Sequence, residues 1–97
     1  MATALTDAQV AEALGKLTGW ERNGDNLART FTFDDYLAGV GFAAAVGMIC
    51  EVRNHHPELL DVGYKKVVVE FTTHDAGSKI TQNDIDVAAA INALMNE

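Results

Sequence analysis

The chain has 97 residues, of which 48% are hydrophobic and 22% charged, a balance typical of one soluble globular domain and not of a disordered chain. Its 7 Lys and Arg against 14 Asp and Glu give a net charge of −7, which disfavours binding to nucleic acid or to anionic lipid. The one cysteine, Cys50, has no partner for an intramolecular disulfide, as expected in a reducing compartment. We therefore expect a single cytoplasmic domain over residues 1–97, with no nucleic acid and no membrane among its partners.

No targeting or membrane-spanning segment is predicted. Residues 1–7 have neither the basic part nor the long apolar part of a signal peptide. The longest uncharged stretch, residues 36–50, is shorter than the ~20 residues that cross a bilayer, and a run of this size is typical of a buried helix.

The first predicted helix begins after Thr6, whose spacing from Gln9 is that of a capping box. Apolar residues then recur at helical spacing, and we expect Gly19 to stop the helix. The apolar stripe consists of Val10, Leu14 and Leu17.

A β-hairpin is predicted next. Residues 20–22 and 27–33 have strand character, and the residues between them, 23–26, have the composition of a tight turn. Phe31 and Phe33 share one face of the second strand, so this sheet is expected to be covered on one face only.

The second predicted helix is capped by Asp34 or Asp35 and runs to about Arg53. It ends before His56, because Pro57 disfavours helical backbone in the residue that precedes it. The sheet-facing stripe is Phe42, Val46 and Ile49, and a second face of small side chains is Gly39, Ala43 and Gly47. Small faces let another helix approach closely, so this face is expected to contact another helix of the domain or a second subunit.

The remaining elements are two strands, a turn and a helix. The strands are predicted over residues 62–65 and 66–73, and Gly77 marks the turn. Thr81 caps the last helix with Asp84 at the capping-box position. Its apolar stripe is Val87, Ile91 and Leu94. The fold class is therefore α+β, in the order α-β-β-α-β-β-α, with the helices on one face of a four-stranded antiparallel sheet.

All three histidines lie at the ends of predicted elements: His55, His56 and His74. Imidazole takes up and releases protons near pH 7, as general acid–base catalysis requires. Glu51 lies four residues before His55, so one more helical turn would put both on one face. Three interpretations stay open: surface histidines in polar loops, a zinc site of three His and Glu51, and a metal-free acid–base site. Zinc is the least favoured, because adjacent histidines point apart and no HExxH or CxxC spacing is present.

A family resemblance covers nearly the whole chain. Its motifs are Glu51-Val52-Arg53-Asn54-His55-His56-Pro57-Glu58, then Tyr64, Thr73-His74-Asp75 and Asp84. Together they resemble the signature of the pterin-4a-carbinolamine dehydratases. The resemblance implies the same α+β fold and dehydration of 4a-hydroxytetrahydropterin to quinonoid dihydropterin, which recycles tetrahydrobiopterin-type cofactors. Such an enzyme is a lyase that needs no cofactor of its own and no metal.

The resemblance also implies roles for individual residues. His55 and His74 would form the acid–base pair, and His56 would position the pterin with Glu51 as its orienting neighbour. Asp84 would either support His74 from behind or only cap the last helix. The residues implied in substrate binding are Glu51, Asn54, Pro57, Thr73, Asp75 and Asp84.

Partners are implied as well. Family members form dimers or tetramers, so a homodimer or homotetramer is expected, with the small-residue face of Gly39, Ala43 and Gly47 as a seam. The alternative function is a protein-binding module, since relatives include a transcription-factor dimerisation cofactor and Rubisco assembly factors. The intact histidine motif favours the enzyme.

Overall fold

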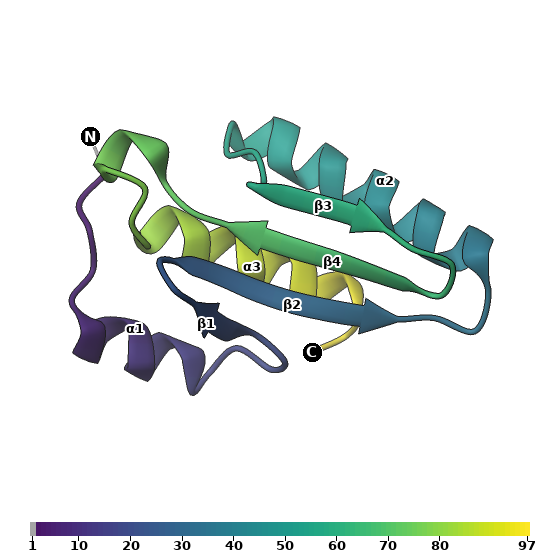
Figure 1. The fold of residues 1–97 in the computed structure, drawn as a ribbon, viewed down its shortest axis with the longest axis horizontal. Coiled ribbons are helices and arrows are strands. Elements are labelled where there is room, and N and C mark those ends of the chain that lie inside the picture. Colours follow the sequence, from purple (N-terminus) through teal and green to yellow (C-terminus); the bar gives the residue numbers. More distant parts are fainter. Residues whose placement is uncertain (1) are drawn as a thin grey trace.

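The computed structural model describes residues 2–97. Its elements are α1 (Asp7–Leu14), β1 (Glu21–Asn23), β2 (Asn26–Thr32), α2 (Tyr36–Arg53), β3 (Leu59–Val62), β4 (Lys66–Phe71), the short 3-10 helix η1 (His74–Ala76) and α3 (Gln82–Leu94). The predicted order α-β-β-α-β-β-α is confirmed. Figure 1 shows α2 and α3 lying behind the sheet, with α1 beside β1.

The four strands form one antiparallel sheet in the order β1-β2-β4-β3. β4 therefore lies in the centre, paired with β2 from Leu27↔Phe71 to Thr32↔Lys66. Alternate residues of β4 are fully buried against the helices: Val67, Val69 and Phe71. Because β3 and β4 are antiparallel, the start of β3 and the end of β4 meet at one end of the sheet. The polar segments that flank these strands consequently lie together.

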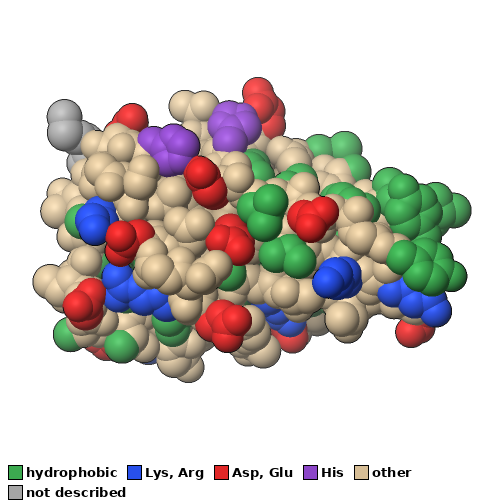
Figure 2. Space-filling view, in the orientation of Figure 1, with side chains coloured by type: hydrophobic (Ala, Val, Ile, Leu, Met, Phe, Trp, Pro, Cys, Tyr) green, Lys and Arg blue, Asp and Glu red, His purple; other side chains and the backbone are tan. Residues whose placement is uncertain are grey.

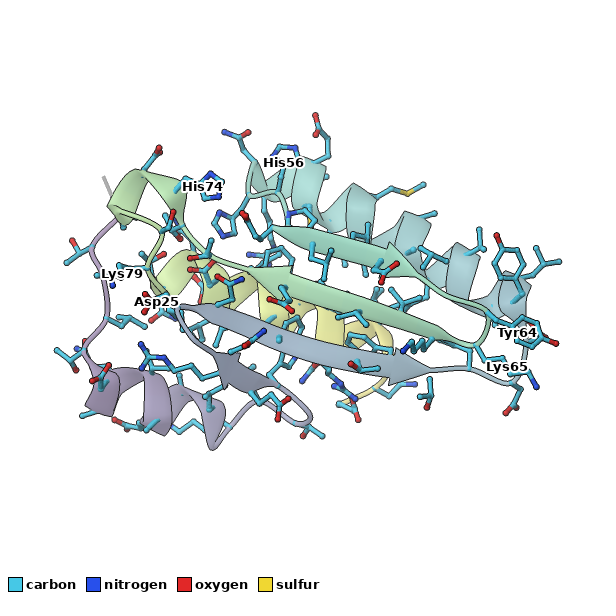
Figure 3. All side chains as sticks on the ribbon, viewed as in Figure 1. Asp25, His56, Tyr64, Lys65, His74 and Lys79 are labelled. Carbon is cyan, nitrogen blue, oxygen red and sulfur yellow. The ribbon has the colours of Figure 1, made fainter. Side chains whose placement is uncertain are left out.

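The position of β3 corrects the sequence prediction. A strand was expected over residues 62–65, whereas β3 is Leu59–Val62 and the chain turns between Gly63 and Lys66, where the Gly63 amide donates to the Lys66 carbonyl at 2.8 Å. The pairing of Val62 with Val67 requires this turn. Tyr64 consequently lies at the tip of the turn, and Figure 3 places it at the opposite end of the molecule from the labelled histidines.

The helix N-termini agree with the prediction. Capping boxes are present at Thr6 with Gln9 and at Thr81 with Asp84, and each of these side chains accepts a hydrogen bond from the backbone of the other residue's turn. Asp35, one of the two expected caps of α2, accepts from an amide of the first turn. These local hydrogen bonds satisfy donors that the helix itself leaves unpaired, which fixes where each helix begins.

Two helix ends differ from the prediction. α1 ends at Leu14, so Leu17 is buried from the turn that follows the helix, and Gly19 closes that turn with φ 80°. A Cβ on Gly19 would lie 2.4 Å from the Arg29 side chain, which explains the glycine. At the end of α3 the apolar stripe continues from Ile91 to Met95, the partly buried residue that follows the helix. Leu94, which was predicted to belong to the stripe, is 44% exposed.

Helix α2 covers the sheet with one face and leaves the other face exposed. The buried residues of α2 are Gly39, Phe42, Ala43, Val46 and Cys50. A Cβ on Gly39 would lie 3.4 Å from both Phe33 and Val67, so this part of the small-residue face packs on the sheet and not on another helix. By length and composition alone α2 is able to cross a membrane, contrary to the expectation from its uncharged part. Its place over the sheet assigns it to the helical layer of the domain.

Candidate functional site

The three histidines meet at one end of the sheet, where four elements converge. α2 stops at Arg53, because Asn54 takes the left-handed conformation with φ 51° and Pro57 follows three residues later. A hollow of about 570 Å³ opens there. Its lining is Ala2, Asn54, His55, His56, Pro57, Glu58, Thr72, Thr73, His74, Asp75 and Asn83. Figure 2 shows two histidine surfaces close together along this edge, with acidic side chains beside them.

His55 is the most firmly held of the three rings. Its Nε2 lies 2.6 Å from Oδ1 of Asp84, which is fully buried, and its side chain is only 15% exposed. The ring also stacks on Phe71, with centroids 5.9 Å apart and planes 17° from parallel. A hydrogen bond to a buried carboxylate and a stacked aromatic ring fix both the direction and the tilt of the imidazole.

The sequence left two roles open for Asp84, and the hydrogen bonds of its carboxylate distinguish them. Its Oδ2 accepts hydrogen bonds from the Thr81 amide and the Thr73 hydroxyl, both at 2.8 Å, and the Thr73 and Thr81 hydroxyls are 2.7 Å apart. Asp84 is thus the capping-box partner of Thr81 at the start of α3 and at the same time the partner of His55, not of His74. The Thr73 side chain is buried and directed at this carboxylate.

The other two histidines are exposed and also face carboxylates. His56 Nε2 lies 2.8 Å from Glu51 Oε1, and His74 Nε2 lies 2.5 Å from Glu58 Oε2. Glu51 is therefore beside His56, and not on a helical face shared with His55, because the helix has already ended. Sequence reasoning did not select Glu58 as a site residue. Its place beside His74 depends on the pairing of β3 with β4.

One rule describes all three rings: Nε2 is directed at a carboxylate, from Asp84, Glu51 and Glu58 respectively. A carboxylate only accepts hydrogen bonds, so the Nε2 of each ring must carry the proton. Nδ1 is then the ring nitrogen on which a proton can be gained or lost. It is a base when the ring is neutral and an acid when the ring is charged.

Among the residues predicted to bind substrate, Asn54, Pro57, Thr73 and Asp75 line the large hollow, and Glu51 is not in its lining. Cys50 lies outside it, buried among apolar side chains, and burial raises the pKa of its thiol, which agrees with a core residue. Within residues 2–97 no group of three or more His, Cys, Asp or Glu is arranged to hold a metal ion.

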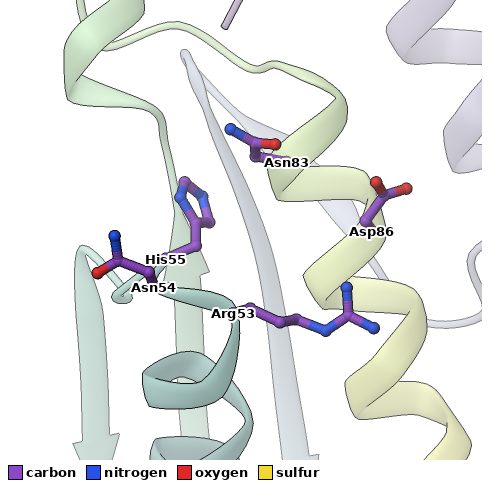
Figure 4. Close-up of a pocket in the computed structure, with 5 residues that line it drawn as sticks. All are labelled: Arg53, Asn54, His55, Asn83 and Asp86. Carbon is purple, nitrogen blue, oxygen red and sulfur yellow. The ribbon is translucent and has the colours of Figure 1, made fainter. Parts of the chain in front are cut away.

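A second hollow of about 320 Å³ adjoins the first on the side of α3. Its lining is Arg53, Asn54, His55, Asn83 and Asp86. Figure 4 shows Arg53 extending from the end of α2 towards α3, where Asn83 and Asp86 lie on successive turns. Neither Arg53 nor Asp86 was selected from the sequence as a site residue, because nothing in the local pattern shows that the two helix ends meet.

Comparison with known proteins identifies the family of this chain. The family model described as pterin 4 alpha carbinolamine dehydratase matches residues 3–94. A protein of Natronomonas pharaonis, provisionally named pterin-4-alpha-carbinolamine dehydratase, is 47% identical over 97% of this chain and 98% of its own. One of Roseiflexus sp. (strain RS-1), with the same provisional name, is 41% identical over 98% of this chain and 100% of its own.

Solved structures share the fold. The crystal structure of a transcriptional coactivator/pterin dehydratase from Brucella melitensis has a TM-score of 0.87 and 33% identity, over 94% of this chain and 97% of that one. A pterin dehydratase-like protein identified as a RuBisCO assembly factor in the alpha-carboxysome has a TM-score of 0.66 at 23% identity, over 78% of this chain and 88% of that one, and shows the common fold. On the match across residues 3–94, the identities and the shared fold, this chain belongs to the pterin-4a-carbinolamine dehydratase family.

Proposed function

We propose that this protein is a lyase that dehydrates 4a-hydroxytetrahydropterin to quinonoid dihydropterin, and so recycles tetrahydrobiopterin-type cofactors. The observation that carries the proposal is the meeting of three imidazoles around one hollow, each with Nε2 against a carboxylate. In the reaction an acid gives a proton to the C4a hydroxyl, the C4a–O bond breaks and water leaves. A base takes the N5 proton, and the N–H electron pair forms the N5=C4a double bond. Proton transfers of this kind are what positioned imidazoles supply.

We assign the acid–base pair to His55 and His74, which enter the hollow from the two segments that flank β3 and β4. His56, beside Glu51, would position the pterin. Among the residues expected to bind substrate, Asn54, Pro57 and Asp75 line the hollow. Thr73 and Asp84 support the proposal in another way, because their hydrogen bonds hold His55.

The test is the decay of freshly generated 4a-hydroxytetrahydropterin, followed by ultraviolet absorbance with and without the purified protein. We expect wild type to accelerate the decay, and His55→Ala and His74→Ala each to lower turnover by roughly 10²-fold or more, the scale of lost acid–base catalysis. Tyr64→Ala is the matched control, because it removes an exposed ring at the opposite end of the molecule. Circular dichroism verifies that each variant is folded. A folded wild type that leaves the spontaneous rate unchanged rejects the proposal.

Self-association is favoured by the exposed face of α2, and not by the expected seam, because Gly39 and Ala43 of that seam are buried in the domain. An uninterrupted apolar stripe follows this face at helical spacing, Leu37, Gly41, Ala44, Met48 and Val52. Three of its side chains, Leu37, Met48 and Val52, are 74%, 69% and 87% exposed. Exposed apolar patches of this kind mark interaction surfaces. We propose that a second copy of the chain covers it in a homodimer or homotetramer.

This interface has its own test. Met48→Glu places a charge in the middle of the stripe, so light scattering after size exclusion should report a smaller mass than for wild type. Glu12→Gln on α1 is the control, because it changes a charge on another helix. A monomeric wild type would reject the homo-oligomer. A wild type that is monomeric and also inactive on the carbinolamine would instead favour a separate protein partner. We place the domain and its pterin substrate in the cytoplasm, without nucleic acid or membrane, in line with the acidic charge.

A further inference from the structure

We propose that Asp25 and Lys79, both outside the lining of the two hollows, are positioning residues for His74. Their ion pair ties the loop that carries His74 to the turn between β1 and β2. Figure 3 shows the two side chains together at the end of the molecule that holds His74. This inference rests on the proposed function, since it takes His74 to be one of the two acid–base groups. It adds to that function two residues that act through the ring.

The loop that carries His74 is closed on itself and held at its two ends. It runs from Thr73 to Lys79, and the Thr73 amide donates to the Lys79 carbonyl at 2.9 Å. At its start, the Thr73 hydroxyl is hydrogen-bonded to the buried Asp84 carboxylate. At its end, the Lys79 ammonium lies 2.9 Å from Oδ2 of Asp25. His74 lies between these two attachments, so both determine the position of its ring.

Asp25 contacts the chain on both sides of His74. Its carboxylate pairs with Lys79, which ends the loop, and its backbone carbonyl accepts a hydrogen bond from the buried Thr72 hydroxyl at 3.0 Å, just before the loop begins. The carboxylate is held in turn by Arg22, whose Nη2 lies 3.3 Å from Oδ1 of Asp25. The β1–β2 turn is therefore a fixed support for the loop at both of its ends.

The ring and its loop depend on support of this kind. The side chain of His74 is 68% exposed and that of its partner Glu58 is 43% exposed, so packing does not fix the ring. The loop also contains two consecutive residues with left-handed backbone, Gly77 with φ 78° and Ser78 with φ 59°. This conformation is unfavourable for serine, and it persists where the surrounding structure enforces it. Lys79 follows directly, so its ion pair acts where the loop is strained.

The first test is a kinetic double-mutant cycle between Lys79 and His74. Lys79→Met and Asp25→Asn should each lower kcat for carbinolamine decay by about three- to tenfold and leave KM unchanged. This loss lies between the value of one exposed ion pair and the ~10²-fold that a displacement of about 1 Å can cost. Lys79→Arg, which keeps the pair, should retain the kcat of wild type. In a His74→Ala background, Lys79→Met should have no further effect, because the ring through which it acts is gone.

The second test does not depend on activity. Nuclear Overhauser contacts between the His74 ring and the Glu58 side chain should be present in wild type and weakened in Lys79→Met, whose fold is verified by circular dichroism. Lys65→Met is the matched control, because it makes the same change on the β3–β4 turn at the opposite end of the molecule (Figure 3). It should change neither kcat nor the contact.

The outcomes separate this inference from the proposed function. The positioning role is rejected if Lys79→Met keeps the kcat of an active wild type, or if it lowers kcat equally in wild type and in the His74→Ala background. It is also rejected if Lys79→Met retains the contact between His74 and Glu58. If wild type does not accelerate carbinolamine decay but Lys79→Met loses this contact, the positioning role stands and the proposed lyase activity fails.

Discussion

Replacement of Asp84 by asparagine should abolish most of the proposed activity while the protein stays folded. The carboxylate accepts three hydrogen bonds, one at Oδ1 from His55 and two at Oδ2 from the Thr73 hydroxyl and the Thr81 amide. An amide has only one accepting oxygen. That oxygen must take the Oδ2 position, because an NH₂ group there would face the Thr81 N–H.

The NH₂ group of the substituted side chain would then face His55, which can no longer keep a proton on Nε2. The proton moves to Nδ1, and the nitrogen that faces the ligand changes from a base into a donor. We therefore expect turnover to fall by about 10²- to 10⁴-fold, the full contribution of a general base. Exchange of a charge-assisted hydrogen bond for a neutral one costs roughly 1–2 kcal/mol. A domain with about 5–15 kcal/mol of stability withstands that loss.

Three measurements decide the outcome: urea unfolding for stability, carbinolamine decay for turnover, and ¹⁵N-detected NMR of the histidine ring for the tautomer. Asp35→Asn is the matched control, because it makes the same change at the N-cap of α2, where Asn is also a good cap. The reasoning is refuted if Asp84→Asn retains wild-type turnover, or if His55 keeps its proton on Nε2.

Glu58→Gln should lower kcat by about tenfold, less than loss of the His74 ring itself, because the ring loses the carboxylate that holds its Nε2 at 2.5 Å; a variant with the kcat of wild type would contradict this. The Lys79 ammonium beside Asp25 lowers the pKa of that carboxyl below its usual 3.8, so the ionised form stabilises the fold above about pH 4 and the effect is lost as the pH falls further. Urea midpoints of wild type and Asp25→Asn should accordingly differ at pH 7 and approach each other as the pH falls below about 4, and a constant difference would count against the pair. The Cys50 thiol, buried and with a raised pKa, should resist a disulfide reagent at pH 8 until urea unfolds the chain, whereas rapid reaction of the native protein would show that the core opens.

The fold class and most helix starts could be predicted from the sequence because they depend on local interactions. A capping box needs only the residues of one turn, as at Thr6 and Thr81, and one buried face gives β4 its period of two. The predicted limits of β3 were wrong because, by its apolar pattern alone, Val62 is equally able to begin a strand or to end one. Pairing with β4 selects the register that turns at Gly63.

In the site, too, some features follow from the local sequence and others depend on tertiary contacts. The three histidines could be selected from their positions at element ends and from the family resemblance. Of their partners, Glu51 beside His56 was predicted through the resemblance. The other two could not be, since Asp84 reaches His55 only when the start of α3 packs beside the end of α2, and Glu58 reaches His74 only through the β3–β4 pairing. The meeting of Arg53 with Asp86 likewise depends on tertiary packing.

Apart from Ala2, the side chains of both hollows come from the chain between Glu51 and Asp86. This stretch contains the end of α2, the β3–β4 hairpin and the first turns of α3, while residues 2–33 contribute packing and the outer half of the sheet. Substitutions in the N-terminal third should therefore be selected mainly for their effect on folding. Substitutions in the central stretch should be selected for their effect on the reaction as well. A saturation library can be measured for both protein abundance and turnover. Apart from those at Asp25, which supports Lys79, substitutions that lower turnover without lowering abundance should lie on the C-terminal side of a boundary within α2.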